Sequence, residues 1–372
     1  MNYRMMSRFI SLILLVEVIF MLPALALALW DHNMVVALAF LDGMCATLLV
    51  SVILHAFCQR GRKGIFAKAG LVCVAISWIV MSLLGCLPFF LSGEIPNYVD
   101  ALFEIVSGFT TTGASILPEV ESHSRAVLYW RSFSHWLGGM GVLVFLLAIA
   151  PSGGAAGGFT MHLLRAESPG PNVGKLVPRM RETAKILYIM YILLTVMDIF
   201  FLLLGNMPLF DAICTAFGTA GTGGFGIKND SIASYSPYIQ NVCTVFMLLF
   251  GVNFSCYYLL LMRQVRNVFK DEELRLYFCI VAGSILLITL NLRGFYGTVE
   301  ETVRHAAFQV SSIITTTGYA TADFDLWPSF SKAILLGLMV VGACAGSTGG
   351  GLKCGRVLLL MKSLRRNIGR VL

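Results

Sequence analysis

Long apolar runs separated by short polar segments follow one another along the whole chain. Several runs are close to the roughly 20 residues that an α-helix needs to cross a bilayer. The pattern predicts an all-α integral membrane protein with about eight transmembrane helices. These lie at 9–30, 35–57, 70–92, 126–150, 184–205, 238–262, 275–292 and 331–361.

Three shorter apolar segments recur between these runs, and each ends in a Thr-Gly pair. They are "DALFEIVSGFTTTGAS" (100–115), "DAICTAFGTAGTGGFG" (211–226) and "HAAFQVSSIITTTGYA" (305–320). Each is too short to cross the membrane and return, so it is predicted to be a re-entrant pore helix followed by a turn. Non-helical backbone at membrane depth is tolerated where protein buries it or where it lines a water-filled cavity.

This internal repetition predicts the organisation of the chain. Two N-terminal transmembrane helices come first, then three units of the form span, pore helix, span, with a cytoplasmic linker after the first unit. The predicted boundaries are 1–60, 61–151, 152–183, 184–265 and 266–372.

Composition and charge agree with a membrane location and supply an orientation. The chain is 57% hydrophobic and 13% charged, with a mean hydropathy of +0.80. Most Lys and Arg residues fall on one side of the predicted spans, which places that side and the N-terminus in the cytoplasm. The net charge of +7 is therefore read as a topogenic signal and an attraction to anionic lipid, not as a nucleic-acid surface. The ten cysteines form no Cys-x-x-Cys pair and are read as buried apolar residues.

The Thr-Gly turns have a chemistry that suits a cation. Glycine permits a positive φ, so a turn can direct successive carbonyl oxygens to one side. Carbonyls from several segments can then replace the water shell of an alkali cation, and a helix C-terminus pointed at the cavity adds the negative end of its dipole. The alternative is that Thr and Gly only permit close helix packing. Three copies at equivalent places favour the cation filter.

A second Gly-rich stretch, "GACAGSTGGGLKCGR" (342–356), interrupts the last apolar run. Small residues at this density favour an unwound loop, which would lie on the cytoplasmic side of the third turn and could act as a gate. A phosphate-binding loop is the competing interpretation, but Leu352 separates Gly351 from Lys353 and breaks the required spacing. Lys353 and Arg356 could stabilise the loop, repel cations or mark the membrane boundary.

Isolated polar residues give no sign of catalysis. Glu17 and Asp198 lie in apolar spans, where a structural role competes with a functional one. The histidines have no metal-ligand spacing, and a membrane-embedded enzyme would need a cluster of titratable residues that the sequence lacks. The chain is predicted not to be an enzyme.

These motifs, together with "RAESPGP" (165–171), resemble the Trk/Ktr/HKT superfamily of potassium transporters, most closely its bacterial uptake subunits. The resemblance covers nearly the whole chain. It implies four span–pore helix–span repeats around one pore, and a homodimer in the bacterial cytoplasmic (inner) membrane. It also implies a partner, a cytosolic nucleotide-binding regulatory subunit. It implies K⁺ as the transported ion and no cofactor in this chain.

The resemblance also assigns the site residue by residue. Gly113 points to potassium rather than sodium, because sodium-favouring members carry Ser there. The implied filter residues are Thr110, Thr111, Thr112, Gly113, Ala220, Gly221, Thr222, Gly223, Thr315, Thr316, Thr317 and Gly318. The implied gate residues are Gly342, Ala343, Cys344, Ala345, Gly346, Ser347, Thr348, Gly349, Gly350, Gly351 and Lys353.

One departure leaves the activity open at this point. The family's fourth repeat does not appear in the 372 residues. A truncated reading frame or a fragment would explain its absence. The leading hypothesis is a K⁺ uptake channel subunit. The alternatives are a Na⁺- or H⁺-coupled symporter on the same scaffold and a truncated subunit that does not conduct.

Overall fold

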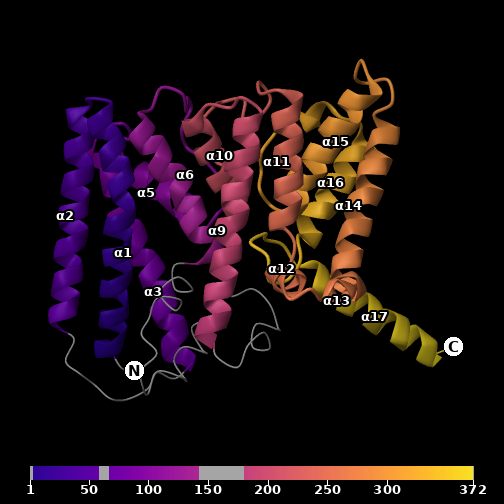
Figure 1. Cartoon of the computed structure of the whole chain (residues 1–372), viewed down its shortest axis with the longest axis horizontal. Coiled ribbons are helices and arrows are strands. Elements are labelled where there is room, and N and C mark those ends of the chain that lie inside the picture. The colour runs from indigo at the N-terminus through magenta and orange to yellow at the C-terminus, as the bar shows by residue number, and fades with distance from the viewer. Residues whose placement is uncertain (1–2, 58–66, 142–179, 372) are drawn as a thin grey trace. The chain divides into compact units, whose positions relative to one another are not determined.

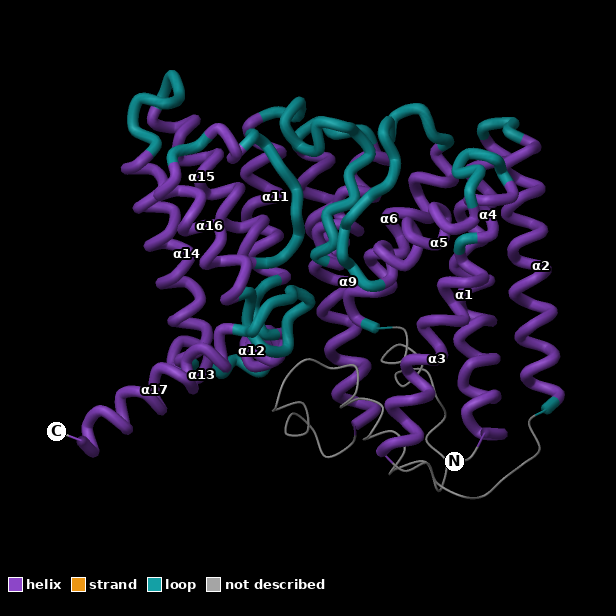
Figure 2. Tube along the Cα trace, turned by 180° about the vertical axis from the view of Figure 1, so that it is seen from behind, coloured by secondary structure: helices purple, strands orange, loops and turns teal. Residues whose placement is uncertain are grey.

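The computed structural model describes residues 3–57, 67–141 and 180–371, and these residues form helices joined by loops (Figures 1 and 2). No strand occurs in these ranges, which confirms the predicted all-α class. The predicted linker at 152–183 and the "RAESPGP" segment lie almost wholly or wholly outside the described residues. So does the end of the predicted span 126–150. The chain divides into two compact units, Met1–Tyr188 and Ile189–Leu372, with α9 crossing the boundary.

The first unit is built on a helical hairpin. Its helices are α1 (Tyr3–Trp30), α2 (Met34–Ala56), α3 (Ala67–Gly85), α4 (Leu87–Leu91), α5 (Tyr98–Phe109) and α6 (Arg125–Met140). The α1–α2 hairpin closes because the Asn33 side chain accepts a hydrogen bond from the Val36 amide, which caps α2. Within the hairpin, Ser51 donates its hydroxyl proton to the Ser11 carbonyl at 2.8 Å, a side-chain bond that links the two apolar helices.

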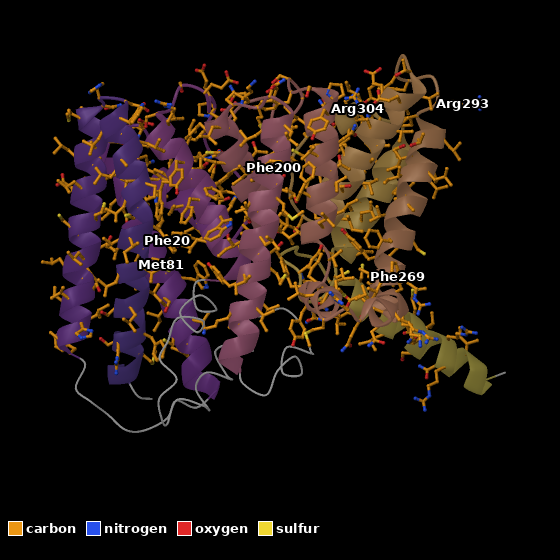
Figure 3. All side chains as sticks on the ribbon, viewed as in Figure 1. Phe20, Met81, Phe200, Phe269, Arg293 and Arg304 are labelled. Carbon is orange, nitrogen blue, oxygen red and sulfur yellow. The ribbon has the colours of Figure 1, made fainter. Side chains whose placement is uncertain are left out.

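Aromatic packing joins this hairpin to α6. The rings of Phe20 and Phe133 lie 5.1 Å apart, and Trp130 is fully buried with its indole N–H donating to the Gly85 carbonyl at 2.9 Å. Phe20 and Met81 are labelled within this unit in Figure 3. The core of the unit therefore lies between α1, α3, α5 and α6.

The second unit repeats one order of elements twice, a long helix, a short helix, a turn and a following helix. It contains α9 (Met180–Leu204), α10 (Leu209–Gly221), α11 (Pro237–Phe250), α12 (Phe254–Leu261), α13 (Val265–Lys270), α14 (Glu272–Asn291), α15 (Val299–Ile314), η2 (Phe324–Leu326), α16 (Ser329–Val341) and α17 (Cys354–Val371). Figure 3 places Arg293 and Arg304 at one end of this unit and Phe269 at the other.

The predicted span at 238–262 is broken into two helices, α11 and α12. The chain bends by 89° between α11 and α12. Asn253 begins a new helix there, because its side chain accepts from the Ser255 amide at 2.9 Å. The main chain at Gly251 also lies so close to α14 that an added Cβ would meet the Tyr277 hydroxyl oxygen at 2.5 Å. Glycine at position 251 therefore permits a close contact between the end of α11 and α14.

Other spans agree better with the hydropathy pattern. Five helices among the described residues are long and apolar enough to cross a membrane, or six if the bent pair counts as one span. The five are Met6–Trp30, Met34–Ala56, Val72–Leu91, Ala184–Leu204 and Glu272–Asn291. The last predicted span, 331–361, is interrupted between α16 and α17, where the sequence places the Gly-rich stretch.

Candidate functional site

Each of the three Thr/Gly stretches follows a short helix. The helices α5, α10 and α15 have 12, 13 and 16 residues, fewer than a bilayer crossing needs. Asn97 caps the start of α5 and Thr298 caps the start of α15, each accepting from a backbone amide. The last carbonyls of each helix have no partner within the helix and carry the negative end of its dipole. Each helix therefore presents a cation-attracting end to the turn that follows it.

The three turns share one backbone conformation. Thr111, Thr222 and Thr316 have positive φ angles of 53°, 53° and 60°, a left-handed conformation that side chains other than glycine rarely adopt. Two residues later, Gly113, Gly224 and Gly318 have φ angles of 74°, 76° and 86°.

One backbone hydrogen bond recurs in the same place in all three turns. It spans five residues and runs from Thr112 N to Ser107 O, from Gly223 N to Gly218 O and from Thr317 N to Ser312 O, at 2.9, 3.0 and 2.9 Å. The repeated letters in the sequence therefore fold into one repeated structure.

This equivalence assigns the second turn to residues one position later than the sequence predicts. By conformation, the residues that match Thr110–Gly113 and Thr315–Gly318 are Gly221–Gly224, whereas the sequence motif gave Ala220–Gly223. Ala220 lies within the last turn of α10. The shift arises because Thr222-Gly223 matches the Thr-Gly letters, while the positive φ falls on the next glycine.

Threonine hydroxyls brace the first and third turns in the same way. Thr110 donates to the Val106 carbonyl at 2.7 Å and lies 2.8 Å from the Thr112 hydroxyl. Thr315 donates to the Ser311 carbonyl at 2.6 Å and lies 2.8 Å from the Thr317 hydroxyl. In the second turn, glycine occupies both equivalent positions, 221 and 223. The threonine hydroxyls thus tie the first and third turns to the ends of their helices.

In the first and third repeats, a side chain nine residues before the turn glycine holds the returning chain. In the first turn it is Glu104, fully buried, which accepts from the Ile116 amide at 3.0 Å, from the Ser115 hydroxyl at 2.9 Å and from Arg131 Nε at 2.5 Å. Arg131 is itself only 3% exposed. The first turn is therefore supported by a buried ion pair.

In the third turn the equivalent residue is Gln309, which donates to the Ala322 carbonyl at 3.0 Å. It is 1% exposed and neutral. The corresponding second-turn residue is Thr215, whose carbonyl accepts from the Tyr319 hydroxyl at 3.0 Å. These supporting residues were missed by the sequence reasoning, because their spacing from the glycine becomes meaningful only once the three turns are aligned.

The second and third turns pack against each other within the second unit. A Cβ placed on Gly224 would lie 1.9 Å from the Thr317 carbonyl oxygen, a distance that no real side chain allows. The Ile232 amide donates to the Ala320 carbonyl at 3.1 Å, and the Tyr319 hydroxyl reaches both Thr215 and Phe225 carbonyls. The main chains of the second and third turns are therefore in direct contact.

The Gly-rich loop, residues 342–353, lies directly against these two turns. The Gly350 amide donates to the Thr316 hydroxyl oxygen at 2.7 Å, and the Thr222 hydroxyl donates to the Thr348 carbonyl at 3.0 Å. A Cβ on Gly349 would lie 2.9 Å from the Thr315 carbonyl. In Figure 1 the loop is the yellow segment beside α12. Its glycines permit this close approach.

The loop is also fixed to the break between α11 and α12. The Cys344 amide donates to the Gly251 carbonyl at 3.0 Å, and the Phe254 amide donates to the Gly346 carbonyl at 3.0 Å. Lys353 bonds with its ammonium group to the Gly349 carbonyl, inside the loop itself. Arg356 is exposed at the start of α17. Lys353 therefore stabilises the loop, which is one of the roles considered for it.

Glu17 and Asp198 stay outside these arrangements. Both are fully buried, and the carboxyl oxygens of the two residues have no hydrogen-bond partner within the described part of the chain. Among the described residues no three His, Cys, Asp or Glu side chains converge as a metal site.

The long apolar helices and the short helices that end in matching turns define a helical membrane protein of the transporter class. The chain belongs to the TrkH family of cation transport proteins, whose family model matches residues 37–371. This confirms the resemblance stated from the motifs. The family is one of cation transporters and not of enzymes.

Individual relatives agree along the full chain. The Trk system potassium uptake protein TrkH of Salmonella typhimurium is 36% identical over 379 residues, covering 100% of this chain and 77% of the relative. TrkH of Escherichia coli K12 is 36% identical over 380 residues with the same coverage. The crystal structure of the potassium transporter TrkH from Vibrio parahaemolyticus matches with a TM-score of 0.86 at 30% identity, again over 100% of this chain and 77% of that one.

Proposed function

We propose that this chain supplies three of the filter segments of a potassium uptake pathway in a bacterial cytoplasmic membrane. The observation that carries the proposal is the shared conformation of the three turns, each at the negative end of a short helix. Carbonyl oxygens of Thr110–Gly113, Gly221–Gly224 and Thr315–Gly318 would replace the water shell of K⁺. The names of the relatives support potassium as the ion.

The Gly-rich loop would be the gate of this pathway. It contacts the second and third turns through Thr222 and Thr316, so a loop in this position obstructs any ion leaving those turns on the loop's side. Moving it requires only that a few hydrogen bonds be exchanged for bonds to water, at a net cost of about 1 kcal/mol each. By family, the partners would be a second copy of the chain and a cytosolic nucleotide-binding regulatory subunit. The N-terminus would be cytoplasmic, as the distribution of Lys and Arg indicates.

The test is cation selectivity in liposomes that contain the purified chain. Gly318→Ser is the decisive variant, because a Cβ at Gly318 meets nothing within 4 Å and the change acts only through the strained φ of 86°. The expected result is a lower ratio of K⁺ to Na⁺ flux. Gly337→Ser in α16 is the matched control, since a Cβ there also meets nothing within 4 Å, at an ordinary φ.

A wild-type chain that passes K⁺ and Na⁺ at equal rates would contradict the filter assignment. So would a Gly318→Ser variant with the selectivity of Gly337→Ser. Growth of a potassium-uptake-deficient bacterium at low external K⁺ provides the same comparison in cells.

A further inference from the structure

Glu273 holds both ends of the Gly-rich loop. It is the second residue of α14, and one of its carboxylate oxygens, Oε1, accepts two backbone hydrogen bonds. One comes from the Ala345 amide at 2.6 Å and the other from the Gly355 amide at 2.8 Å. The two donors lie on either side of the segment that contacts Thr222 and Thr316. A single oxygen therefore joins the two ends of this segment.

The carboxylate is well placed for both donors. Gly355 lies in the first turn of α17, where helix amides have no partner within the helix and the dipole favours a negative charge. Its lack of a side chain leaves room for the carboxylate, because a Cβ there would lie 2.9 Å from Glu273 Oε1. Hydrogen bonds to a charged acceptor are stronger than those between neutral groups, such as the amide–carbonyl bonds at Cys344 and Gly346.

We call the Glu273 carboxylate and its two amide bonds the strap. The start of α14, which carries Glu273, is itself held in place. Asp271 caps α14 by accepting from the Leu274 amide at 2.9 Å, and Leu274 and Tyr277 are buried one turn further on. The neighbouring Glu272 points elsewhere and pairs with Lys362 on α17. The loop and α17 are thus held by α14, which serves as the stationary element.

We propose that Glu273 is the positioning residue that keeps the Gly-rich loop closed against the filter turns, and that release of its two amide bonds is the step that opens the gate. The assignment of the loop as a gate rests on the proposed function. The strap itself concerns only the position of the loop. Because α17 carries one of the two donors, a displacement of α17 would break the strap and free the loop together.

Buried thiols in the loop report its position without any need for ion flux. Cys344 is 1% exposed and Cys354 is 0% exposed, so a water-soluble maleimide reaches them only when the loop leaves its place. The labelling rate of each cysteine is measured by mass spectrometry on the purified 372-residue chain. Cys214 and Cys243, both fully buried elsewhere in the second unit, report global unfolding.

Glu273→Ala is expected to raise the labelling rate of Cys344 and Cys354 by at least about 10-fold, because both charged hydrogen bonds are lost and losing either one shifts an opening equilibrium by about that factor. Glu273→Gln keeps an acceptor oxygen without the charge, and we expect a smaller increase. Glu272→Ala is the matched control, because it removes the adjacent carboxylate and its exposed pair with Lys362 only. Its labelling rates should stay within about twofold of wild type.

Unchanged labelling of Cys344 and Cys354 in Glu273→Ala, with Cys214 protected, would overturn the proposal. If Glu273→Ala also exposes Cys214 and Cys243, Glu273→Gln decides, and wild-type rates in that variant would equally overturn it. K⁺ flux in liposomes then distinguishes the proposal about Glu273 from the proposed function. Raised labelling with raised K⁺ flux supports both strap and gate, whereas raised labelling without K⁺ flux in any form supports the strap and contradicts the proposed function.

Discussion

The first and third turns have the same backbone but entirely different surroundings. Both place a threonine at positive φ and a glycine two residues later, and both brace the turn with a pair of threonine hydroxyls. Yet Thr110 and Thr112 are exposed, while Thr315 and Thr317 are buried. The returning chain is held by a charged pair in one case and by a neutral amide in the other. The conformation of the turn is therefore set locally, and its support differs from repeat to repeat.

The largest expected effect comes from the packing between the second and third turns. Gly224→Ala would force a Cβ to within 1.9 Å of the Thr317 carbonyl, and we expect it to destabilise the second unit by more than about 4 kcal/mol. The measurement is thermal unfolding of the purified chain, followed by labelling of Cys214 and Cys243.

Gly318→Ala is the control for that prediction. It occupies the matching position, with φ of 86° against 76°, but its Cβ meets nothing within 4 Å. The expected cost is only the conformational strain, about 1–2 kcal/mol. Equal losses in the two variants would show that strain in the turn, not contact between turns, sets the requirement for glycine.

The buried ion pair should make the first turn more sensitive than the third. Arg131→Met leaves the Glu104 carboxylate buried without its counter-ion, and breaking such a pair costs about 3–5 kcal/mol. Gln309→Leu in the third turn leaves the Ala322 carbonyl without its donor, at about 1–3 kcal/mol. Thermal unfolding and the K⁺ to Na⁺ flux ratio are measured for both variants.

A double variant sharpens this contrast. Glu104→Gln together with Arg131→Met removes the uncompensated charge and keeps an oxygen that can accept from Ile116 and Ser115. It should be more stable than Arg131→Met alone. If the double variant is no better, the loss comes from the packing of the Arg131 side chain, and charge is not what distinguishes the two turns.

The turns themselves could be predicted from the sequence because local backbone rules govern them. A helix that ends in Thr-Thr-Thr-Gly leaves few choices for the chain, and the interruption at 342–353 follows from glycine density alone. The bend at Gly251 and the register of Gly224 could not, since each depends on what packs against the glycine. Glu273 was hidden for another reason. The amides that donate to it lie 72 and 82 residues away in the sequence. A local sequence pattern cannot predict a hydrogen bond between residues so far apart in the chain.

The smallest expected effect distinguishes the outer ends of the two repeats by pH. After the first turn, the chain re-enters α6 where the Glu94 carboxylate accepts from the Ser124 amide at 3.0 Å and lies 3.3 Å from His123 Nδ1. Burial alone would raise the pKa of Glu94, but the hydrogen bonds from His123 and Ser124 outweigh it and hold the pKa below its ordinary value. At the matching place in the third repeat, α16 begins after Pro328 with no side-chain cap and no acidic residue in its first turn.

Because the folded state holds this proton more weakly than the unfolded chain, the stabilisation is complete above the ordinary glutamate pKa and is lost as pH falls through the lower, folded value. After correction for the intrinsic pH dependence of exchange, the protection of amides at the start of α6 should therefore fall between about pH 5 and pH 3 by a factor that corresponds to less than about 1 kcal/mol. The start of α16 should show no such acid-linked step. Glu94→Gln should remove the step, while Glu119→Gln, at an exposed carboxylate in the same unit, should leave it unchanged. A step that persists in Glu94→Gln would mean that another group of the first unit titrates there, and the two repeats would then differ for a reason other than this clasp.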